Sequence, residues 1–316
     1  MDTKIKRVLV GISGTSRRVL AAAAEIAHKS NAPVSLVTVV RPMGPTYGLA
    51  AGAAIMTNRA AAAAEMKRLE RLAKPLRTAG LRVECHVELN ESITEGLLSC
   101  IHRFDPSLVA IEAHKHNVFA RLVLTQTDYN LIRHCPVPLL IVKNARRRSS
   151  SKIMAALDPL GTSSKAAALD AEIAAAAHGF ARLVRGAVHG AHVYPPLMGF
   201  VGDATFAPVA IPVSLPEQRA YVATARKSFR SFCSRNRIKR GKVHLRMGDP
   251  VVALPKLARS MKARMVVMGA VARSALGRAF IGSTAEHVLD AMPCDVLVVK
   301  MPQSPVASGR SVAKAA

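Results

Sequence analysis

The sequence predicts an α/β protein of two tandem domains, each a parallel sheet of five strands between two layers of helices. Three observations support this prediction. Short apolar runs alternate with longer Ala-rich stretches, and strands that alternate with helices form βαβ units with parallel pairing. The 316 residues suit two domains of ordinary size. The second half of the chain also repeats the pattern of the first.

The repeat is clearest between residues 111–143 and residues 268–300, which align without a gap at an offset of 157 residues. Both segments end in a proline, an apolar run and a lysine. The segment between the repeats is polar and basic, and the end of the chain is rich in Ser, Ala and Lys, so neither is expected to fold into a core. The expected parts are a first domain at 1–145, a linker at 146–151, a second domain at 150–303 and a disordered tail at 304–316.

In the first copy, the strands are expected where apolar residues run together, because strands buried on both faces lack alternation. The helices are expected where Ala-rich or amphipathic stretches follow a polar turn. The expected strands are 6–12, 33–40, 81–88, 107–112 and 138–143. The expected helices are 15–30, 58–79, 91–104 and 126–134.

The second copy follows the same order of elements. Its apolar runs include Val-Val-Met at 266–268, directly before a glycine. The expected strands are 152–157, 187–194, 242–247, 264–269 and 295–300. The expected helices are 163–184, 216–236, 250–262 and 283–291. In such open parallel sheets, ligands bind beyond the carboxyl ends of the strands, where the strand order reverses.

Cysteine usage and hydropathy indicate a cytoplasmic protein. The five cysteines are odd in number and widely spaced, without a C-x-x-C pair, which is typical of buried thiols in a reducing compartment. The N-terminus lacks the apolar core of a signal peptide, and no run of 18 apolar residues occurs, so we expect no membrane span. Half of the residues are apolar, which excludes a disordered chain.

The chain is strongly basic, with 45 Lys+Arg against 20 Asp+Glu and a formal net charge of +25. Residues 219–246 contain ten of these cations and no acid, and run from a helix into a strand. Cations stabilise a helix C-terminus, but a surface this positive should also bind polyanions in a salt-dependent way. Tyr221, Phe229 and Phe232 are expected on the buried face of the helix, so base stacking is not predicted.

A glycine-rich loop in the second half could hold a triphosphate. Gly269 ends a strand, and Gly282 precedes Ser283 and Thr284 at the start of a helix. Glycine lets the backbone approach an anion, and a helix N-terminus presents free N–H groups and a positive dipole end. The alternative is structural, because Ser283 and Glu286 have the spacing of a capping box.

Asp158 follows the first strand of the second half and could accept hydrogen bonds from a base or a sugar. Its alternative role is to start the turn before Pro159. Further motifs are a Val-Val-Met-Gly strand, the Gly-x12-Gly-Ser-Thr loop, the closing Pro-to-Lys strands, and the Ala-His-Lys-His and Thr-x-Thr-Asp-Tyr stretches of the first half. With these motifs, both halves resemble the universal stress protein family, and the tandem layout is similar to its two-domain members.

The resemblance implies a five-stranded parallel sheet of the adenine-nucleotide-binding α-hydrolase type and pairing of the two domains through their last strands. It further implies an ATP site, with Mg²⁺ if ATP is bound, in the second domain alone. The implied site residues are Asp158, Gly269, Gly282, Ser283 and Thr284. The family's second loop glycine falls on Ala272, whose β-carbon disfavours the required backbone and weakens the ATP prediction. Neighbouring Arg273 could contact a phosphate or lie in solvent.

In the first half the match to this site fails. Ser13 stands where the aspartate would be, and Glu112 replaces the first loop glycine. Lys115 replaces the second glycine, and Thr125 and Gln126 replace the Gly-Ser pair. Glu112 and Asp128 would place negative charge near a phosphate. We therefore predict that the first half does not bind ATP in the family's manner and serves pairing or another ligand.

No catalytic or metal site is predicted. The sequence contains no nucleophile elbow, HExxH or Walker A motif, and His114 and His116 lack a third ligand nearby. Three alternative functions remain: a slow ATP hydrolase, a polyanion-binding protein and a binder of an apolar ligand. A homodimer is also possible. The apolar ligand would lie beneath one of the inserts at 42–56 and 195–216, which we otherwise expect to fold as lids over their own sheets.

Overall fold

The computed structural model describes residues 5–14, 16–43, 49–115, 122–143, 150–160, 164–201, 209–270 and 283–301. Strands and helices alternate through the first half, as the apolar runs predicted. The strands of the main sheet are β1 (Val8–Gly11), β2 (Val34–Val40), β3 (Val83–Leu89), β4 (Leu108–Glu112) and β7 (Leu139–Val142). The helices are α1 (Arg17–Ser30), α2 (Leu49–Thr78), α3 (Ile93–Phe104) and α4 (Gln126–His134).

The second half repeats this order of elements. Its strands in the main sheet are β8 (Lys152–Ala156), β9 (Ala187–Tyr194), β12 (Val243–Met247), β13 (Met265–Gly269) and β14 (Asp295–Val299). Its helices are α5 (Ser164–Leu183), α6 (Leu215–Arg235), α7 (Pro250–Ser260) and α8 (Ser283–Ala291). Two short hairpins, β5 (His114–Lys115) with β6 (Leu122–Val123) and β10 (Met198–Val201) with β11 (Val209–Pro212), were not predicted.

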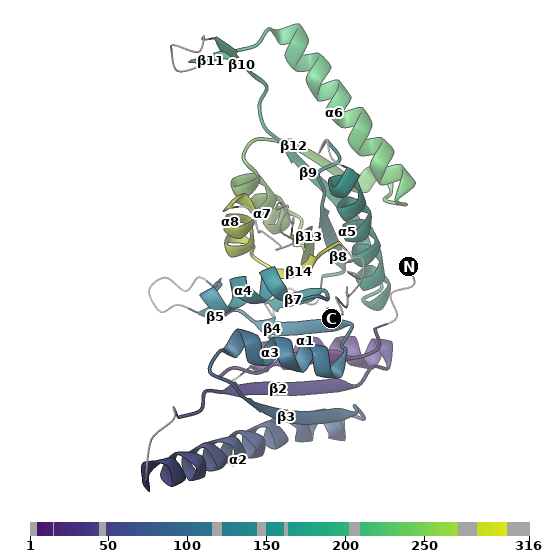
Figure 1. Cartoon of the computed structure of the whole chain (residues 1–316). Coiled ribbons are helices and arrows are strands. Elements are labelled where there is room, and N and C mark those ends of the chain that lie inside the picture. The colour runs from purple at the N-terminus through teal and green to yellow at the C-terminus, as the bar shows by residue number, and fades with distance from the viewer. Residues whose placement is uncertain are drawn as a thin grey trace, which may run out of the picture.

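The ten strands of the two halves, apart from the hairpins, form one sheet in the order β12-β9-β8-β13-β14-β7-β4-β1-β2-β3 (Figure 1). The strands are parallel within each half, which confirms the predicted fold class. The halves join where β14 pairs antiparallel with β7, with Leu297 opposite Leu140. The pairing through the last strands that the resemblance implied is therefore present.

Helices cover both faces of the sheet, which gives three layers. Alternate strand residues point to opposite faces, so Val8 and Val10 pack on one side and Leu9 on the other. One buried cluster holds the side chains of α1, α2, α5 and α6, and the second holds those of α3, α4, α7 and α8. Each cluster contains residues from both β7 and β14, so the two apolar cores run through the junction of the halves without interruption.

The two repeated lysines explain the closing motif of each half. Lys143, just after β7, donates from its Nζ to the carbonyl oxygens of Leu289 and Asp290 at the end of α8. Lys300, just after β14, donates from its Nζ to the carbonyls of Arg133 and Cys135 at the end of α4, both at 2.7 Å. Burial lowers the pKa of each lysine to about 8. Each half therefore caps the last helix of the other.

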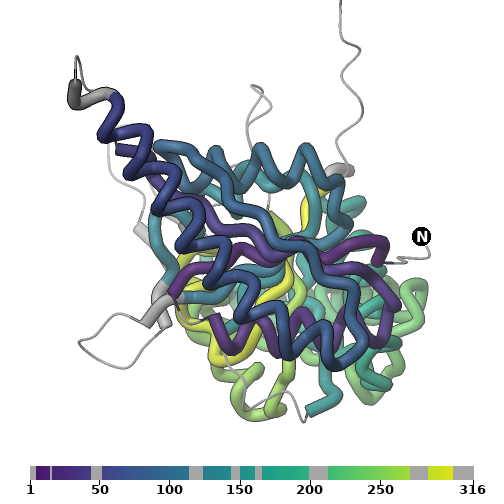
Figure 2. Tube along the Cα trace, turned by 90° about the horizontal axis from the view of Figure 1, so that it is seen from below, coloured from purple at the N-terminus to yellow at the C-terminus, as the bar shows by residue number. Residues whose placement is uncertain are grey.

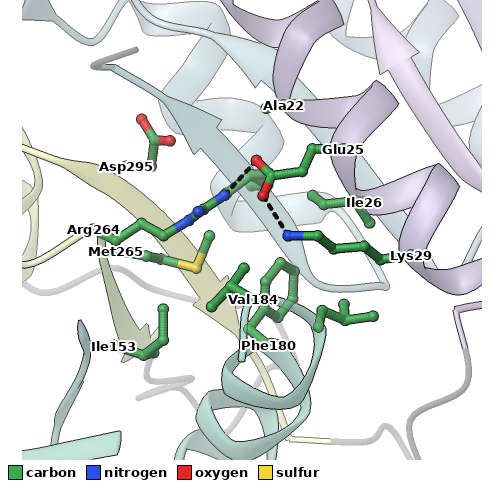
Figure 3. Close-up of a pocket in the computed structure, with 12 residues that line it drawn as sticks. Ala22, Glu25, Ile26, Lys29, Ile153, Phe180, Val184, Arg264, Met265 and Asp295 are labelled. Atoms are coloured by element: carbon green, nitrogen blue, oxygen red, sulfur yellow. Dashed lines mark hydrogen bonds and ion pairs between the residues drawn. The ribbon is translucent and has the colours of Figure 1, made fainter. Parts of the chain in front are cut away.

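A charged contact and a small cavity also lie between the halves (Figure 3). The carboxylate of Glu25 on α1 accepts two hydrogen bonds. One comes from Nη2 of Arg264, the residue before β13, at 2.5 Å, and the other from Nζ of Lys29 at 2.6 Å. Partial burial alone would raise the pKa of Glu25, but these two hydrogen bonds bring it below its usual value. The cavity beside them has a volume of about 10 Å³ and is lined by Phe180 and Met265 among others, so it has room for one water at most.

In their described parts, the two apolar inserts do not lie over their own sheets as the predicted lids would. In the first, α2 begins at Leu49 rather than at residue 58, and its first turns project beyond the sheet beside β3 (Figure 2). Ile55 and Met56 are 55% and 67% exposed there. In the second, β10 and β11 pair with each other and extend away from the sheet beyond its edge strand β12 (Figure 1). Residues 44–48 and 202–208 of the inserts lie outside the described residues.

The cysteines, the helix lengths and the domain ends test further predictions from the sequence. Four cysteines are buried, Cys85 is half-buried, and none of the five is in a disulfide, as predicted. Among the described residues, no helix is long and apolar enough to cross a membrane. Phe229 and Phe232 are buried on α6, as predicted, whereas Tyr221 is only half-buried. The expected tail at 304–316 and most of the linker lie outside the described residues.

Candidate functional site

Two of the predicted site residues, Asp158 and Gly269, lie at the edge of the sheet where the strand order reverses in the second half. From β8 the chain proceeds outward to β9 and β12, and then returns to the other side of β8 as β13. Asp158 lies two residues beyond β8, and Gly269 ends β13, the neighbouring strand. The carboxyl ends of β8 and β13 therefore carry two predicted site residues at the position where such sheets bind ligands.

Asp158 is fixed through its backbone, while its side chain faces solvent. Its N–H donates to both carboxylate oxygens of Asp170 on α5, at 3.1 and 3.0 Å. Its own side chain is 71% exposed. Asp170 is buried, and burial first, with the nearby charge of Asp158, raises the pKa of its carboxyl group to about 6. The arrangement holds the Asp158 carboxylate exposed at this edge of the sheet, where it can accept hydrogen bonds from a ligand.

His192 on β9 lies beneath this turn. Its Nδ1 is 2.9 Å from the carbonyl oxygen of Leu157 and 3.8 Å from Oδ1 of Asp158. Its buried Nε2 has no hydrogen-bond partner among the described residues. Burial lowers the pKa of the imidazole, so it is neutral and donates from Nδ1 to Leu157. Sequence reasoning missed both His192 and Asp170, although each is a polar residue in an apolar stretch.

Gly269 has a packing role that the sequence did not reveal. A β-carbon at this position would lie 2.5 Å from Cδ2 of Leu169 and 3.2 Å from Cδ1 of Ile173, both on α5. A β-carbon here would force the side chain of Leu169 to shift, so glycine allows α5 to lie close to β13 without that rearrangement. The glycine therefore has a structural reason that does not depend on a ligand, and its role in phosphate binding stays a prediction.

The other loop residues are placed less completely. Gly282, together with Ala272 and Arg273, lies outside the described residues. Ser283 begins α8, and Thr284 is exposed in the first turn of that helix. Glu286, the expected partner in a capping box, forms an ion pair at 2.6 Å with Arg133 of α4, in the other half. The carboxylate of Glu286 thus contributes to the junction between the halves.

At the matching edge of the first half, a carboxylate of the chain occupies a helix N-terminus. Glu112, at the end of β4, accepts the backbone N–H groups of Arg18 and Val19 at 3.1 Å each. It also forms an ion pair with Nε of Arg18 at 2.7 Å. The Arg18 guanidinium further donates to the carbonyls of Lys143 at 2.8 Å and Ala113 at 3.1 Å. The N-terminus of α1 is therefore already neutralised by an anion from within the protein.

The N-terminus of α4 in the same half is capped in a similar way. Thr125 and Asp128 form a capping box, in which the Thr125 N–H donates to Asp128 at 2.7 Å. Asp128 is only 4% exposed. Leu124 donates its N–H to Asp290 of α8 at 3.1 Å, which ties this turn to the other half. Glu112 and Asp128, the two carboxylates that the sequence placed near a phosphate position, thus each lie at a helix N-terminus.

Comparisons with known proteins agree with this geometry. A model of the Universal stress protein family matches residues 4–143 and again residues 150–300. Universal stress protein E of Escherichia coli K12 is 28% identical over 241 residues, which cover 73% of this chain and 72% of that protein. The Universal stress protein E homolog of Haemophilus influenzae is 25% identical over 227 residues, or 70% of each chain.

Solved structures share the whole fold. A functionally unknown protein from Pseudomonas aeruginosa PAO1 superposes with a TM-score of 0.74 at 24% identity, over 95% of this chain and 94% of that chain. A universal stress protein from Archaeoglobus fulgidus superposes with a TM-score of 0.63 at 18% identity, over 93% and 98%. At these sequence identities the superpositions show that the other two proteins share the fold of two joined halves.

Proposed function

Because the chain belongs to the universal stress protein family, matched once in each half, we propose that it is a tandem stress-response protein whose second half binds ATP. The proposed site comprises Asp158, Gly269, Gly282, Ser283 and Thr284. Asp158 would accept hydrogen bonds from the base or the sugar, and the helix N-terminus and hydroxyls at 283–284 would receive the phosphates. Mg²⁺, bound with ATP, would neutralise phosphate charge. The five cysteines outside any disulfide support a reducing compartment such as the cytoplasm.

One observation carries the proposal. The two halves are alike in fold, yet at the switch in strand order the first places Glu112 and the second Gly269. The carboxylate of Glu112 fills the N-terminus of α1, whereas the second half presents an exposed Asp158 side chain and no acid at that strand end. In the first half Glu112 already accepts the N–H groups that a phosphate would need, whereas in the second half no carboxylate stands at this position.

Calorimetry with ATP, with and without Mg²⁺, tests the site. We expect one molecule of ATP per chain and a loss of about tenfold or more in affinity for Asp158→Ala, which removes a charge-assisted hydrogen bond. Ser13→Ala changes the matching position of the first half and should leave ATP binding unchanged. Ala272→Gly, which restores the family's glycine, should tighten binding. No heat from the wild type or from Ala272→Gly would overturn the proposal, and phosphate release over hours would reveal a slow hydrolase.

A second function, polyanion binding, is favoured by the basic edge formed by α6 and β12. Nine of the ten cations in residues 219–246 are exposed, and none of the ten has a carboxylate partner among the described residues. The triple variant Arg226→Gln, Lys227→Gln, Arg230→Gln should reduce the salt dependence of DNA binding by a slope of up to about 3. Three exposed cations of α2 provide a control of equal charge: Lys67→Gln, Arg71→Gln and Lys74→Gln. Equal effects of the two triple variants would show that only net charge matters.

A further inference from the structure

A cluster of three potential metal ligands lies in the first half, outside the proposed nucleotide site. His86 and Glu88 alternate along β3 and so share one face of the sheet, where α3 brings the buried thiol of Cys100 beside them. Their ligand atoms all lie within 4.8 Å of one another. We propose that His86, Glu88 and Cys100 bind a divalent transition metal of the Zn²⁺ class.

The spacing of the ligand atoms fits a tetrahedral ion. With metal distances of about 2.0 Å to N and O and 2.3 Å to S, tetrahedral angles put N and O about 3.3 Å apart, and S and O about 3.5 Å apart. The distance from His86 Nε2 to Glu88 Oε2 is 3.0 Å, and that from Cys100 Sγ to Glu88 Oε2 is 3.7 Å. The third pair of ligand atoms, His86 Nε2 and Cys100 Sγ, lies within 4.8 Å. A tetrahedral ion held by the three would keep a fourth position for water.

The chain's own cation occupies the cluster in this structure. Arg103 Nη1 lies 2.9 Å from His86 Nε2, and Arg103 Nη2 lies 3.1 Å from Glu88 Oε2. The Arg103 side chain is 48% exposed at the end of α3, so it can leave toward solvent. A guanidinium between an imidazole nitrogen and a carboxylate shows that the cluster attracts positive charge, which a smaller divalent ion would supply more strongly.

The hydrogen bonding around His86 is also incomplete without a metal. Nε2 faces a donor, Arg103, and an acceptor, Glu88, at 2.9 and 3.0 Å. A neutral Nε2 either carries a proton or presents a lone pair, so it satisfies one of these partners and not both. A metal ion would take the lone pair of Nε2 and the charge of Glu88 together. Phe104 meets the imidazole edge-on, with ring centroids 5.3 Å apart, and restrains the ring.

The thiol completes a mixed N, O, S ligand set, which suits zinc and cobalt better than magnesium or calcium. Burial, followed by the charge of Glu88, raises the pKa of Cys100 to about 12, so the thiol is protonated in the metal-free protein. A bound metal ion reverses this preference and binds the thiolate. Metal binding at this cluster therefore releases a proton.

The second half lacks the cluster. In the first half His86 of β3 pairs with Val37 of β2, and in the second half His244 of β12 pairs with Ala191 of β9. Val37 and Ala191 are equivalent positions of the repeat, so His244 stands where the first half has His86. By the same register Arg246 stands in the place of Glu88. The offset of 157 residues puts Leu257 in the place of Cys100. One metal ion per chain is therefore expected.

Cobalt titration of the full chain without nucleotide tests the proposal. We expect one equivalent of Co²⁺, a near-ultraviolet thiolate-to-cobalt absorption band, and loss of the band when Zn²⁺ is added. Cys100→Ala should abolish the band. It should also lower the affinity for Zn²⁺ at least about tenfold, as measured by competition with a chromophoric chelator. Arg103→Gln should tighten binding, because no internal cation has to be displaced. Cys85→Ala is the matched control, since Cys85 precedes His86 and packs on the opposite face.

Two results would overturn the proposal. One is the absence of the band in both the wild type and Arg103→Gln; the other is a band that survives Cys100→Ala and disappears in Cys85→Ala. Circular dichroism shows whether Cys100→Ala folds. If it does not, Glu88→Gln removes a ligand while keeping the shape of the side chain, and should weaken Zn²⁺ by the same measure. Because ATP is absent, the outcome does not depend on the nucleotide proposal.

Discussion

The two halves of the molecule share one fold and differ at the strand ends where a ligand would bind. In the first half, Glu112 and Asp128 place carboxylates on the N-termini of α1 and α4, and Arg18 neutralises Glu112. In the second half, the corresponding strand end is Gly269, and the Asp158 carboxylate faces solvent. A duplicated domain can thus hold an internal ion pair at this strand end in one copy, while the other copy has a glycine there and an exposed carboxylate on the neighbouring strand.

The largest effect is expected from breaking the ion pair of the first half. Glu112→Ala removes the acceptor of two backbone N–H groups and of Nε of Arg18, in an ion pair whose Arg18 and Glu112 side chains are only 24% and 12% exposed. We expect a loss of about 3 kcal/mol in the free energy of unfolding, measured with urea.

Glu84→Ala is the control for this variant. It removes an ion pair with Arg7, but the Glu84 side chain is 58% exposed, so the loss should be below about 1 kcal/mol. Similar losses for the two variants would show that Glu112 has no special role at the end of α1.

Gly269→Ala tests the packing reason for glycine in the second half. The new β-carbon would meet Leu169, and we expect a loss of about 2 kcal/mol from overpacking. In combination with Leu169→Ala the cost should be clearly less than the sum of the single variants, since the two side chains compete for one space. Gly52→Ala is the control, because nothing lies near that position in α2, and it should stabilise by about 0.5–1 kcal/mol. Additive costs would refute the steric explanation.

Asp170→Asn tests the buried carboxyl group that holds the Asp158 turn. The folded pKa of Asp170, about 6, lies above the ordinary value of 3.8, so folding favours the protonated form. The wild type therefore loses stability as the pH rises from about 4 through 6, and the uncharged variant does not. We expect the variant to gain about 1–2 kcal/mol relative to the wild type between pH 4 and pH 8, in urea unfolding. A difference that is independent of pH would contradict this account.

The smallest losses of stability are expected at the lysine contacts, which are the same in both halves. Lys143→Met and Lys300→Met each remove hydrogen bonds to the carbonyls that end a helix of the other half. We expect losses of about 1 kcal/mol each, similar in size, because the two contacts are equivalent across the junction. Thermal unfolding of both variants measures this. A large loss for one lysine alone would show that the junction is not symmetric in energy.

Hydrophobic pattern predicted most of the fold, since strands buried on both faces are legible as apolar runs. The start of α2 was missed because Gly and Pro near residues 42–52 favoured a loop, whereas the Ala-rich sequence that follows carries the helix back to Leu49 in spite of Gly52. The hairpin of β10 and β11 was missed because apolar residues outside a core carry no periodic signal. Both errors lie in the inserts, where packing against the sheet does not constrain the chain.

Of the candidate site, the sequence identified Asp158 and Gly269 and the edge of the sheet on which they lie. It could not identify Asp170, which is 12 residues further along the chain and reaches the Asp158 N–H only because α5 packs over β8. The sequence likewise could not identify the cluster of His86, Glu88 and Cys100, because the first two lie on strand β3 and the third on helix α3, and only the folded chain brings them together. Such sets have no fixed spacing in sequence.

The sequence by itself determined the class of fold, the duplication and the loss of the family's loop glycines from the first half, because periodicity and motif residues are local properties of the chain. Tertiary structure alone decided what replaces that loop, why Gly269 lacks a side chain and how Lys143 and Lys300 serve the opposite half. The physical reason is that ion pairs, steric limits and helix caps depend on distances across the sheet, which arise only when the ten strands have assembled.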